Sequence, residues 1–351
     1  MKENYLFSPK LSQKFSCSVP LKGTLQQFVI NGKVQGEDKP FSLYLPQEKE
    51  MEDILQLISV RTSEVFRPIY SKKSFSASKD KEEKLELNLS SEYFFDNNSS
   101  ARILLCSHTF SLDRFVTNEN VSITLKEGAS AEFIVMQNEH NKATHNTVFN
   151  VNIAEKAKLK MVFISLHGGV ISNTLNVNMN GELAECDLSG LYLTDSKQMM
   201  TTKIDLNHLK PKCKSNQLFK GILDDYGVAK FYGRIIVSPD AQKTEAFQAN
   251  HNLLISNNAK AYTRPQLEIY ADDVKCSHGA TIGRLNDLEL FYMRTRGIPL
   301  YEARLLQQMA FAYEVLENIS NEELKSRMQS LVERRMRGEF ANCRNCSKNC
   351  C

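Results

Sequence analysis

Short apolar runs with a two-residue period fill the middle of this chain and constrain its fold more than any other feature. They recur from Ala101 to Ser277, and no helix-length pattern separates them. A two-residue period is typical of strands with one buried face. Pairs of such strands return at a loose spacing of roughly 25 residues, which indicates a solenoid or a sandwich. The lack of intervening helices argues against alternating βαβ units. Clear examples are Val121/Ile123/Leu125, Phe149/Val151/Ile153 and Leu175/Val177/Met179.

The first hundred residues form a mixed region with weaker patterns. Phe28–Ile30, followed by Asn31 and Gly32, predict a strand and a turn. An amphipathic helix is predicted over 47–62, because its apolar residues are spaced as i, i+3, i+4 and i+7. The Ser- and Lys-rich stretch 71–84 is typical of a solvated loop or boundary. The apolar residues of the predicted helix are Met51, Ile54, Leu55 and Ile58.

After Asp287 the apolar period becomes helical. A first helix containing Leu288 ends at Gly297, and Pro299 suits the first turn of a second. Ser320 and Glu323 predict a capping box for a third helix, which ends near Gly338. The resulting division is a mixed N-terminal region at 1–100, a β-body at 101–284, a helical region at 285–340 and a tail at 341–351.

Composition favours an ordinary soluble protein. Of the 351 residues 42% are hydrophobic and 24% charged, and the net charge is +3. This mild excess gives no case for nucleic acid. Charged residues interrupt Met1–Phe15, so no secretory signal is expected, and no apolar stretch reaches the roughly 18 residues of a membrane helix. We expect a cytoplasmic protein whose nine cysteines are free thiols or metal ligands.

One block resembles a known family. Val237–Ile298 is similar to the shared C-terminal core of the SufB and SufD iron–sulfur cluster assembly proteins. Pro265–Thr281, PQLEIYADDVKCSHGAT, looks like the SufD form, and Leu290–Ile298, LFYMRTRGI, also resembles the family. The resemblance implies a right-handed parallel β-helix with a C-terminal helical cap. It also implies pairing with SufB through the β-helices and docking of the SufC ATPase on the C-terminal helices. In the absence of SufB, the isolated chain could pair with a second copy of itself to form a homodimer.

Two departures favour the SufD side of the family. SufB-like proteins carry a reactive cysteine at a position that falls at or near Ala259 here, and an acidic residue where this chain has Gly279. The sequence also lacks a GxxxxGK[ST] phosphate loop. We therefore expect a non-catalytic scaffold subunit. The family pattern begins with a larger helical region than this chain shows.

Cys276 and His278 are the candidate site residues. Spaced i, i+2 on a strand, they would share one face about 6.5–7 Å apart. A thiolate and an imidazole suit iron or an iron–sulfur cluster, but two ligands are too few for a closed site. The resemblance implies that His278 acts in cluster formation at the SufB–SufD interface. It implies no cofactor held stably by this chain alone, only iron or a nascent cluster in the complex. The alternative is a buried cysteine and a hydrogen-bonded core histidine.

Further candidates lie at the C-terminal end. Within the helical region, the resemblance implies that SufC binds at Leu290, Phe291, Tyr292, Arg294, Arg296 and Gly297. The tail offers four thiols for zinc or an iron–sulfur centre: Cys343, Cys346, Cys350 and Cys351.

Two other functions stay open at this point. One is a metal-binding or redox protein acting through the cysteine tail. The other is a β-helix enzyme acting on polysaccharide, for which the lone Glu268 is weak support. The loop-like residues between His140 and His145 place both histidines at the expected surface.

Overall fold

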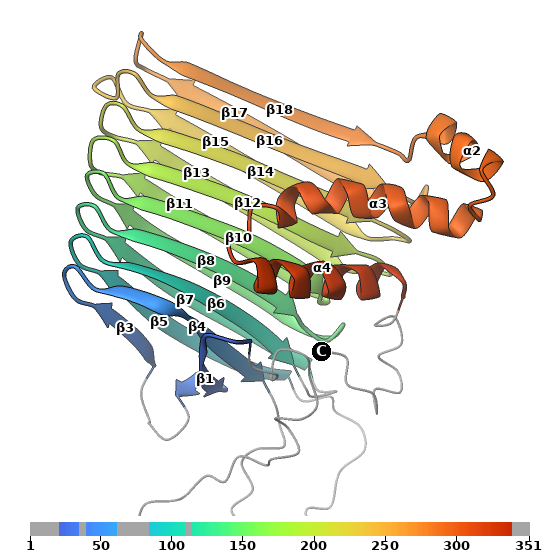
Figure 1. The fold of residues 1–351 in the computed structure, drawn as a ribbon, viewed down its shortest axis with the longest axis horizontal. Helices are drawn as coiled ribbons and strands as arrows, with labels where there is room; N and C mark the ends of the chain where they lie inside the picture. The colour runs from blue at the N-terminus through green and yellow to red at the C-terminus, as the bar shows by residue number, and fades with distance from the viewer. Residues whose placement is uncertain (1–20, 35–39, 62–83, 110–113, 339–351) are drawn as a thin grey trace, which may run out of the picture.

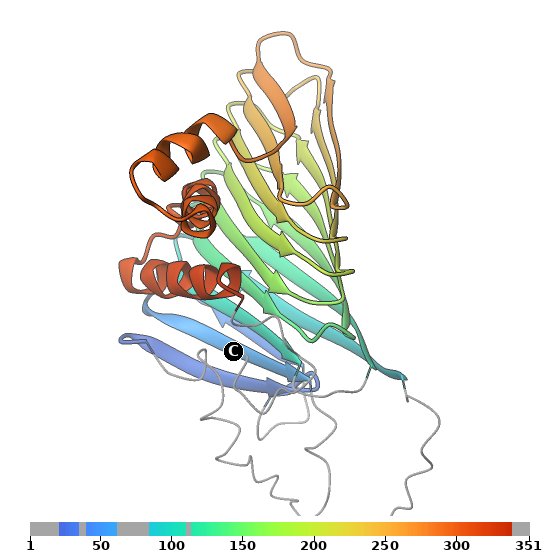
Figure 2. The same cartoon turned by 90° about the vertical axis from the view of Figure 1, so that its right-hand side faces the viewer.

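The computed structural model describes residues 21–34, 40–61, 84–109 and 114–338, which form a parallel β-solenoid with helices along one side (Figures 1 and 2). Two sheets make up the solenoid. Sheet A contains, in spatial order, β18 (Lys275–Gly283), β16 (Glu245–Leu254), β14 (Lys214–Leu223), β12 (Glu185–Thr194), β10 (Lys158–His167), β8 (Ser130–Asn138), β6 (Ser100–Thr109), β4 (Glu50–Arg61), β1 (Thr24–Ile30) and β2 (Lys33–Val34). Sheet B contains β17 (Lys260–Ile269), β15 (Val228–Val237), β13 (Met199–His208), β11 (Val170–Met179), β9 (Thr144–Ile153), β7 (Arg114–Leu125), β5 (Lys84–Phe95) and β3 (Phe41–Leu45).

Each turn of the solenoid consists of one strand of sheet B and the following strand of sheet A. Strands of neighbouring turns pair in parallel, so that Lys158, Glu185 and Lys214 stand opposite one another. The hairpin of β1 and β2 is antiparallel. This arrangement confirms the parallel β-helix that the family resemblance implies, and the solenoid is one of the two folds that the two-residue period indicated. Its sheets also begin before Ala101, since β1 and β4 are already a parallel pair.

Tight corners carry the chain from sheet B to sheet A. At every such corner before the last, one residue takes a left-handed conformation, and its N–H donates to a carbonyl of the next turn. Lys156 N–H, for example, donates to Glu182 O over 2.9 Å, and Lys212 N–H to Gln242 O over 2.8 Å. These bonds continue the ladder through the bend, so the corner backbone keeps its hydrogen bonds. The corner residues are Glu48, Asn98, Gly128, Lys156, Leu183, Lys212 and Lys243.

The main hydrophobic core lies between the two sheets. Phenylalanines from successive turns meet there; the rings of Phe149 and Phe163, for example, are edge-to-face at 5.5 Å. Inward residues of both sheets are buried along the solenoid, as the alternating sequence pattern requires. The aromatic members of this core are Tyr93, Phe95, Phe133, Phe149, Phe163, Tyr192, Phe219 and Phe231.

A second core forms on the outer face of sheet A. Helices α3 (Leu300–Leu316) and α4 (Glu322–Met336) lie against this face, whereas α2 (Asp287–Thr295) follows β18 at the C-terminal end of the solenoid (Figures 1 and 2). Met309 and Leu331 of the helices belong to the same buried cluster as Ile164 of β10. The helical cap is therefore part of the hydrophobic structure and shields one sheet face from water.

The helix predicted over 47–62 is wrong, because this segment contains strand β4. The strand is buried on both faces: Leu55 and Leu57 point into the core between the sheets, while Ile54 and Ile58 point into the core beneath the helices. Burial on both faces removes the polar alternation of an exposed strand and leaves apolar spacings that fit a helix equally well.

The C-terminal helices follow the predicted order with small differences at their starts. Asn321, not Ser320, caps α4, and its Oδ1 accepts the N–H of Leu324 over 2.9 Å. The Ser320 hydroxyl instead accepts a hydrogen bond from Lys160. Pro299 precedes the first turn of α3 as its N-cap residue. Gly297 and Gly338 end the first and third helices with positive φ, as expected.

Candidate functional site at the open end of the solenoid

The last turn of the solenoid is open. Strands β17 and β18 are the edge strands of sheets B and A, and within the described residues no further strand pairs with them. Most of their side chains are at least partly exposed, including Ile269 and Ile282, and so is Tyr270 directly after β17. The end of the solenoid therefore presents two unpaired strand edges and an apolar surface, at the top of Figure 1.

Cys276 and His278 both lie on β18. They are in register with Ala246 and Gln248 of β16, which are buried in the preceding turn. Both side chains therefore belong to columns that face the interior, and the structure places them on one face as their spacing predicts. Because no further turn of the described residues covers them, Cys276 is only half-buried and His278 is exposed. Burial raises the pKa of the Cys276 thiol, partly offset by a hydrogen bond from the Ala246 backbone.

The described cysteines are free thiols, and three of them, Cys106, Cys186 and Cys213, are buried. Burial raises the pKa of Cys186 and Cys213, which keeps these thiols protonated and unreactive. Nowhere in the described ranges do three His, Cys, Asp or Glu side chains gather as a metal site would need. The predicted tail site at Cys343, Cys346, Cys350 and Cys351 lies outside the described residues.

Helix α2 presents the residues expected to bind SufC. Leu290 is buried, whereas Leu288, Phe291 and Tyr292 are 80%, 67% and 58% exposed. The Arg296 guanidinium lies 5.2 Å from the centre of the Tyr292 ring and donates to its hydroxyl over 3.1 Å. Arg294 is exposed, and Gly297 ends the helix.

An apolar groove of about 630 Å³ separates α2 from α3. Exposed apolar side chains beside a groove are typical of protein-binding surfaces. The groove is lined mainly by Leu253, Leu285, Leu288, Tyr292, Leu306 and Phe311.

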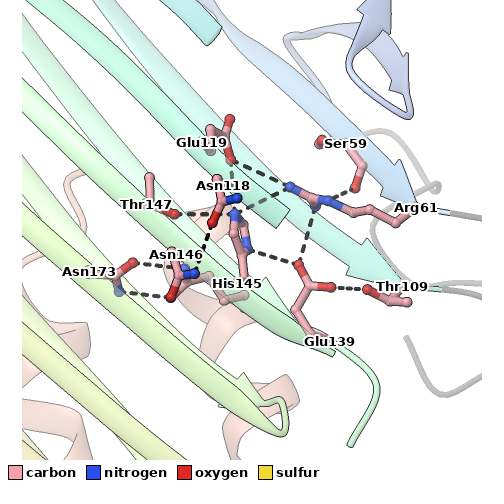
Figure 3. A network of polar contacts seen from close by, with 11 residues as sticks. Ser59, Arg61, Thr109, Asn118, Glu119, Glu139, His145, Asn146, Thr147 and Asn173 are labelled. Atoms are coloured by element: carbon pink, nitrogen blue, oxygen red, sulfur yellow. Dashed lines mark hydrogen bonds and ion pairs between the residues drawn. The ribbon is translucent and has the colours of Figure 1, made fainter. Parts of the chain in front are cut away.

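A buried ionic cluster near the N-terminal end of the solenoid was not predicted from the sequence (Figure 3). The interpretation of His145 as a surface residue is wrong, because it is 2% exposed. Its Nδ1 lies 3.0 Å from Glu139 and its Nε2 lies 3.0 Å from Glu119. Arg61, fully buried, lies 3.2 Å from Glu139 and 3.5 Å from Glu119. Thr109 donates a hydrogen bond to Glu139.

The charges of this ionic cluster balance when His145 is protonated. Burial and Arg61 disfavour the charged imidazole, but the hydrogen bonds to Glu119 and Glu139 outweigh them and raise the pKa of His145. Burial disfavours the Glu139 carboxylate, but Arg61 and His145 outweigh it and lower its pKa to about 2. The cluster therefore contains two cations and two anions, each facing an opposite charge, as buried charges require.

Comparison with known proteins identifies the family. The family described as SUF system FeS cluster assembly, SufBD core domain, matches residues 93–311. This chain belongs to the SufB/SufD family. It is 34% identical to the iron–sulfur cluster assembly protein SufD of Escherichia coli over 70% of this chain and 59% of that protein. It is also 35% identical to a SufBD family protein of Synechocystis over 60% of this chain and 46% of the relative. The chain thus spans about half the length of these relatives.

The SufBD core match covers most of the features described above. It includes the open end with Cys276 and His278, helix α2 and most of α3, as well as Glu119, Glu139 and His145. Arg61 and helix α4 lie outside the match. No helix in the described part of this SufB/SufD family member has the length and apolar character needed to span a membrane.

Proposed function

We propose that this chain is a scaffold subunit in iron–sulfur cluster assembly, which pairs with SufB through its open end and docks the SufC ATPase on the α2–α3 surface. The observation that carries the proposal is the position of Cys276 and His278 on β18, an edge strand whose inward side chains are not covered by another turn in the part of the chain that the structure describes. The names of the SufD and SufBD relatives support a role in iron–sulfur cluster assembly.

Pairing at the open end follows from the unpaired strand edges. The free backbone N–H and C=O groups of β17 and β18 can be satisfied by strands of a second solenoid. Such a partner would also cover the exposed Tyr270 and Ile282, which are 62% and 47% exposed. SufB is the partner proposed here, and a second copy of this chain is the alternative when SufB is absent.

The chemistry at this interface concerns iron as cargo. Cys276 and His278 offer a soft sulfur and a borderline nitrogen ligand, and the partner would supply the remaining ligands. Since burial raises the pKa of Cys276, its thiol stays protonated until a metal or a partner charge favours the thiolate. No stable cofactor is proposed for this chain alone, and its own role is to hold and orient ligands.

Docking of SufC would use α2 and the groove beside it. Phe291 and Tyr292 project from one helix beside an apolar groove, so a helical or loop element of SufC can bury them together. ATP-driven pairing of two SufC subunits would then move this chain relative to SufB and expose Cys276 and His278 to iron.

Co-purification with SufC by size exclusion, with and without SufB, tests the docking surface. The double variant Phe291→Ser/Tyr292→Ser should lose SufC and keep SufB. Tyr44→Ser is the matched control, because Tyr44 is 60% exposed on β3 at the far end of the solenoid. Retention of SufC by the double variant would place its binding elsewhere.

Cluster formation by the reconstituted complex tests the open end. His278→Ala should lower the amount of cluster formed while the complex still assembles, and His140→Ala, in the loop after β8, should have no effect. An unchanged yield with His278→Ala would remove His278 from the proposal.

The cysteine tail carries a second candidate function. Four thiols within the nine residues 343–351 are suited to zinc or an iron–sulfur centre. Metal analysis of the purified chain with and without 342–351 would detect such a site. Equal metal content in both forms would exclude it.

A further inference from the structure

We propose that Gln248, itself held by Gln217, is a positioning residue that fixes the orientation and tautomer of the His278 imidazole. The inference rests on the proposed role of His278 in cluster assembly. It names two residues that would act through His278 without touching the metal.

The three residues form one inward-facing column of sheet A. Gln217 of β14 stands opposite Gln248 of β16, and Gln248 stands opposite His278 of β18. The preceding member of the column is Leu188 of β12, which is fully buried. The column therefore changes from an apolar residue to amides two turns before the open end, and it ends on the exposed His278.

The amide pair leaves one acceptor free. Gln248 Nε2 donates to Gln217 Oε1 over 2.7 Å, although the two side chains are 2% and 0% exposed. Gln248 Oε1 and Gln217 Nε2 have no hydrogen-bond partner among the described residues. Leaving a buried polar atom without a partner costs about 1–3 kcal/mol, so a leucine at position 248 would suit a purely structural column better.

Neighbouring buried amides show the contrast. In the adjacent columns Asn250 Nδ2 donates to the Tyr192 hydroxyl over 3.0 Å and to Phe219 O over 3.1 Å. The Asn250 Oδ1 accepts from Asn252 over 2.8 Å, and Tyr192 donates to Asn252 over 2.6 Å. The polar side-chain atoms of Asn250 thus all have partners, whereas in the glutamine pair Gln248 Oε1, on the last covered turn, has none.

The opposite sheet is shaped around the Gln248 amide. Gly233 of β15 faces it, and a Cβ at this position would lie 2.3 Å from Gln248 Nε2 and 2.8 Å from Oε1. Any larger residue would displace the amide. The absence of a side chain at Gly233 therefore keeps room for a glutamine at 248.

The proposed contact joins the free Oε1 to the ring of His278, the in-register neighbour of Gln248 on β18. In-register residues on neighbouring strands stand about 4.8 Å apart, and their side chains lean over one another. A neutral imidazole has one N–H donor and one lone-pair nitrogen. When Gln248 Oε1 accepts the N–H, the other nitrogen keeps its lone pair for a metal at the subunit interface. Gln217 Oε1 accepts from the Gln248 NH₂ group, which leaves the Gln248 oxygen available in this arrangement.

The test is the tautomer of His278, measured by long-range ¹H–¹⁵N spectra of the full chain labelled at histidine, at a pH where the ring is neutral. The wild type should show one predominant tautomer, and Gln248→Leu should show a mixture. Gln217→Leu should have a smaller effect in the same direction. Ser215→Ala is the control, since Ser215 is a buried polar residue of the adjacent column.

Cluster formation supplies the second readout. In the assembled complex Gln248→Leu should lower the initial rate about 10- to 100-fold, as loss of an outer-shell partner does at metal sites. An unchanged tautomer ratio in a folded Gln248→Leu chain would overturn the inference, even if His278→Ala abolishes cluster formation. If His278→Ala has no effect, the proposed function fails at this residue, while the spectra still decide whether Gln248 contacts the ring.

Discussion

Arg61 and Glu139 lie 3.2 Å apart, Nη1 to Oε1, and both are almost completely buried although β4 carries one and the loop after β8 carries the other. The contact joins the first turns of the solenoid to the middle of sheet A. With His145 and Glu119 it forms a cluster in which each charge depends on its neighbours.

Removal of Arg61 should be strongly destabilising. Arg61→Met leaves Glu139 buried without its main cation, and breaking a buried ion pair from one side costs about 3–5 kcal/mol in unfolding free energy. Denaturation by guanidinium measures the effect. Arg234→Met is the matched control, because Arg234 is 43% exposed and lies 2.8 Å from Asp205. The exposed pair should contribute at most about 1 kcal/mol. Equal losses in the two variants would contradict the prediction.

Stability should also depend on pH through His145. The folded-state pKa of His145 is raised above its ordinary value of 6.5, so its contribution is complete below pH 6.5 and is lost as the pH rises through the folded-state pKa. Glu139 acts in the opposite sense. The contribution of Glu139 to the unfolding free energy is complete above pH 4.5, its ordinary pKa, and is lost as the pH falls towards the folded-state pKa of about 2. The ionic cluster is therefore most stabilising between these two ordinary values.

Denaturation curves at several pH values would measure this dependence. The unfolding free energy of the wild type should fall above pH 6.5, and His145→Gln should flatten that fall. The variant should be less stable at pH 6, since Glu139 and Glu119 then keep only Arg61 as a counter-charge. The same slope in both proteins would show that another group is responsible.

The two-residue period predicted strands wherever a strand has one polar and one apolar face. Strands such as β9 and β11 alternate because their outer side chains meet water. The prediction was wrong at Met51–Ile58, because strand β4 is buried on both faces there and lacks the alternation of polar and apolar residues. The apolar cluster on the outer face of sheet A buries Ile54 and Ile58 and so gives this strand helix-like apolar spacings.

The residues of the candidate sites also fall into those that the sequence predicted and those that it did not. The spacing of Cys276 and His278 predicted a shared face, because that relation is local to one strand. The ionic cluster and the Gln217–Gln248 pair were missed, since their members come from different turns and only the strand register brings them together. A residue's neighbour in a solenoid lies one turn away, and the lengths of the intervening corners decide which residue that is.

Asparagine in place of Leu183 should make the corner between β11 and β12 more stable. Leu183 has a φ of 58° and is 43% exposed, so it takes a left-handed conformation without compensating burial. Such a conformation costs an ordinary residue roughly 1–2 kcal/mol, and asparagine tolerates it better. Leu183→Asn should raise the unfolding free energy by about 1 kcal/mol. Glu182→Asn, at the neighbouring position, should give no gain, and a gain of equal size there would attribute the effect to something other than the backbone.

Arg335 should hold helix α4 on sheet A. Its Nε donates to Leu166 O over 2.8 Å and its Nη2 lies 2.7 Å from Asp195, while the side chain is 5% exposed. Hydrogen bonds to charged groups contribute about 1.5–3 kcal/mol, so Arg335→Ala should loosen α4 by a similar free energy. Lysine should not replace it, because it cannot direct donors to both partners at once. Hydrogen exchange of the α4 amides should accelerate in Arg335→Ala and in Arg335→Lys. It should stay unchanged in Arg304→Ala, because Arg304 is exposed on α3. Protection of α4 in Arg335→Ala equal to the wild type would mean that the apolar contacts of Leu331 and Val332 hold the helix without it.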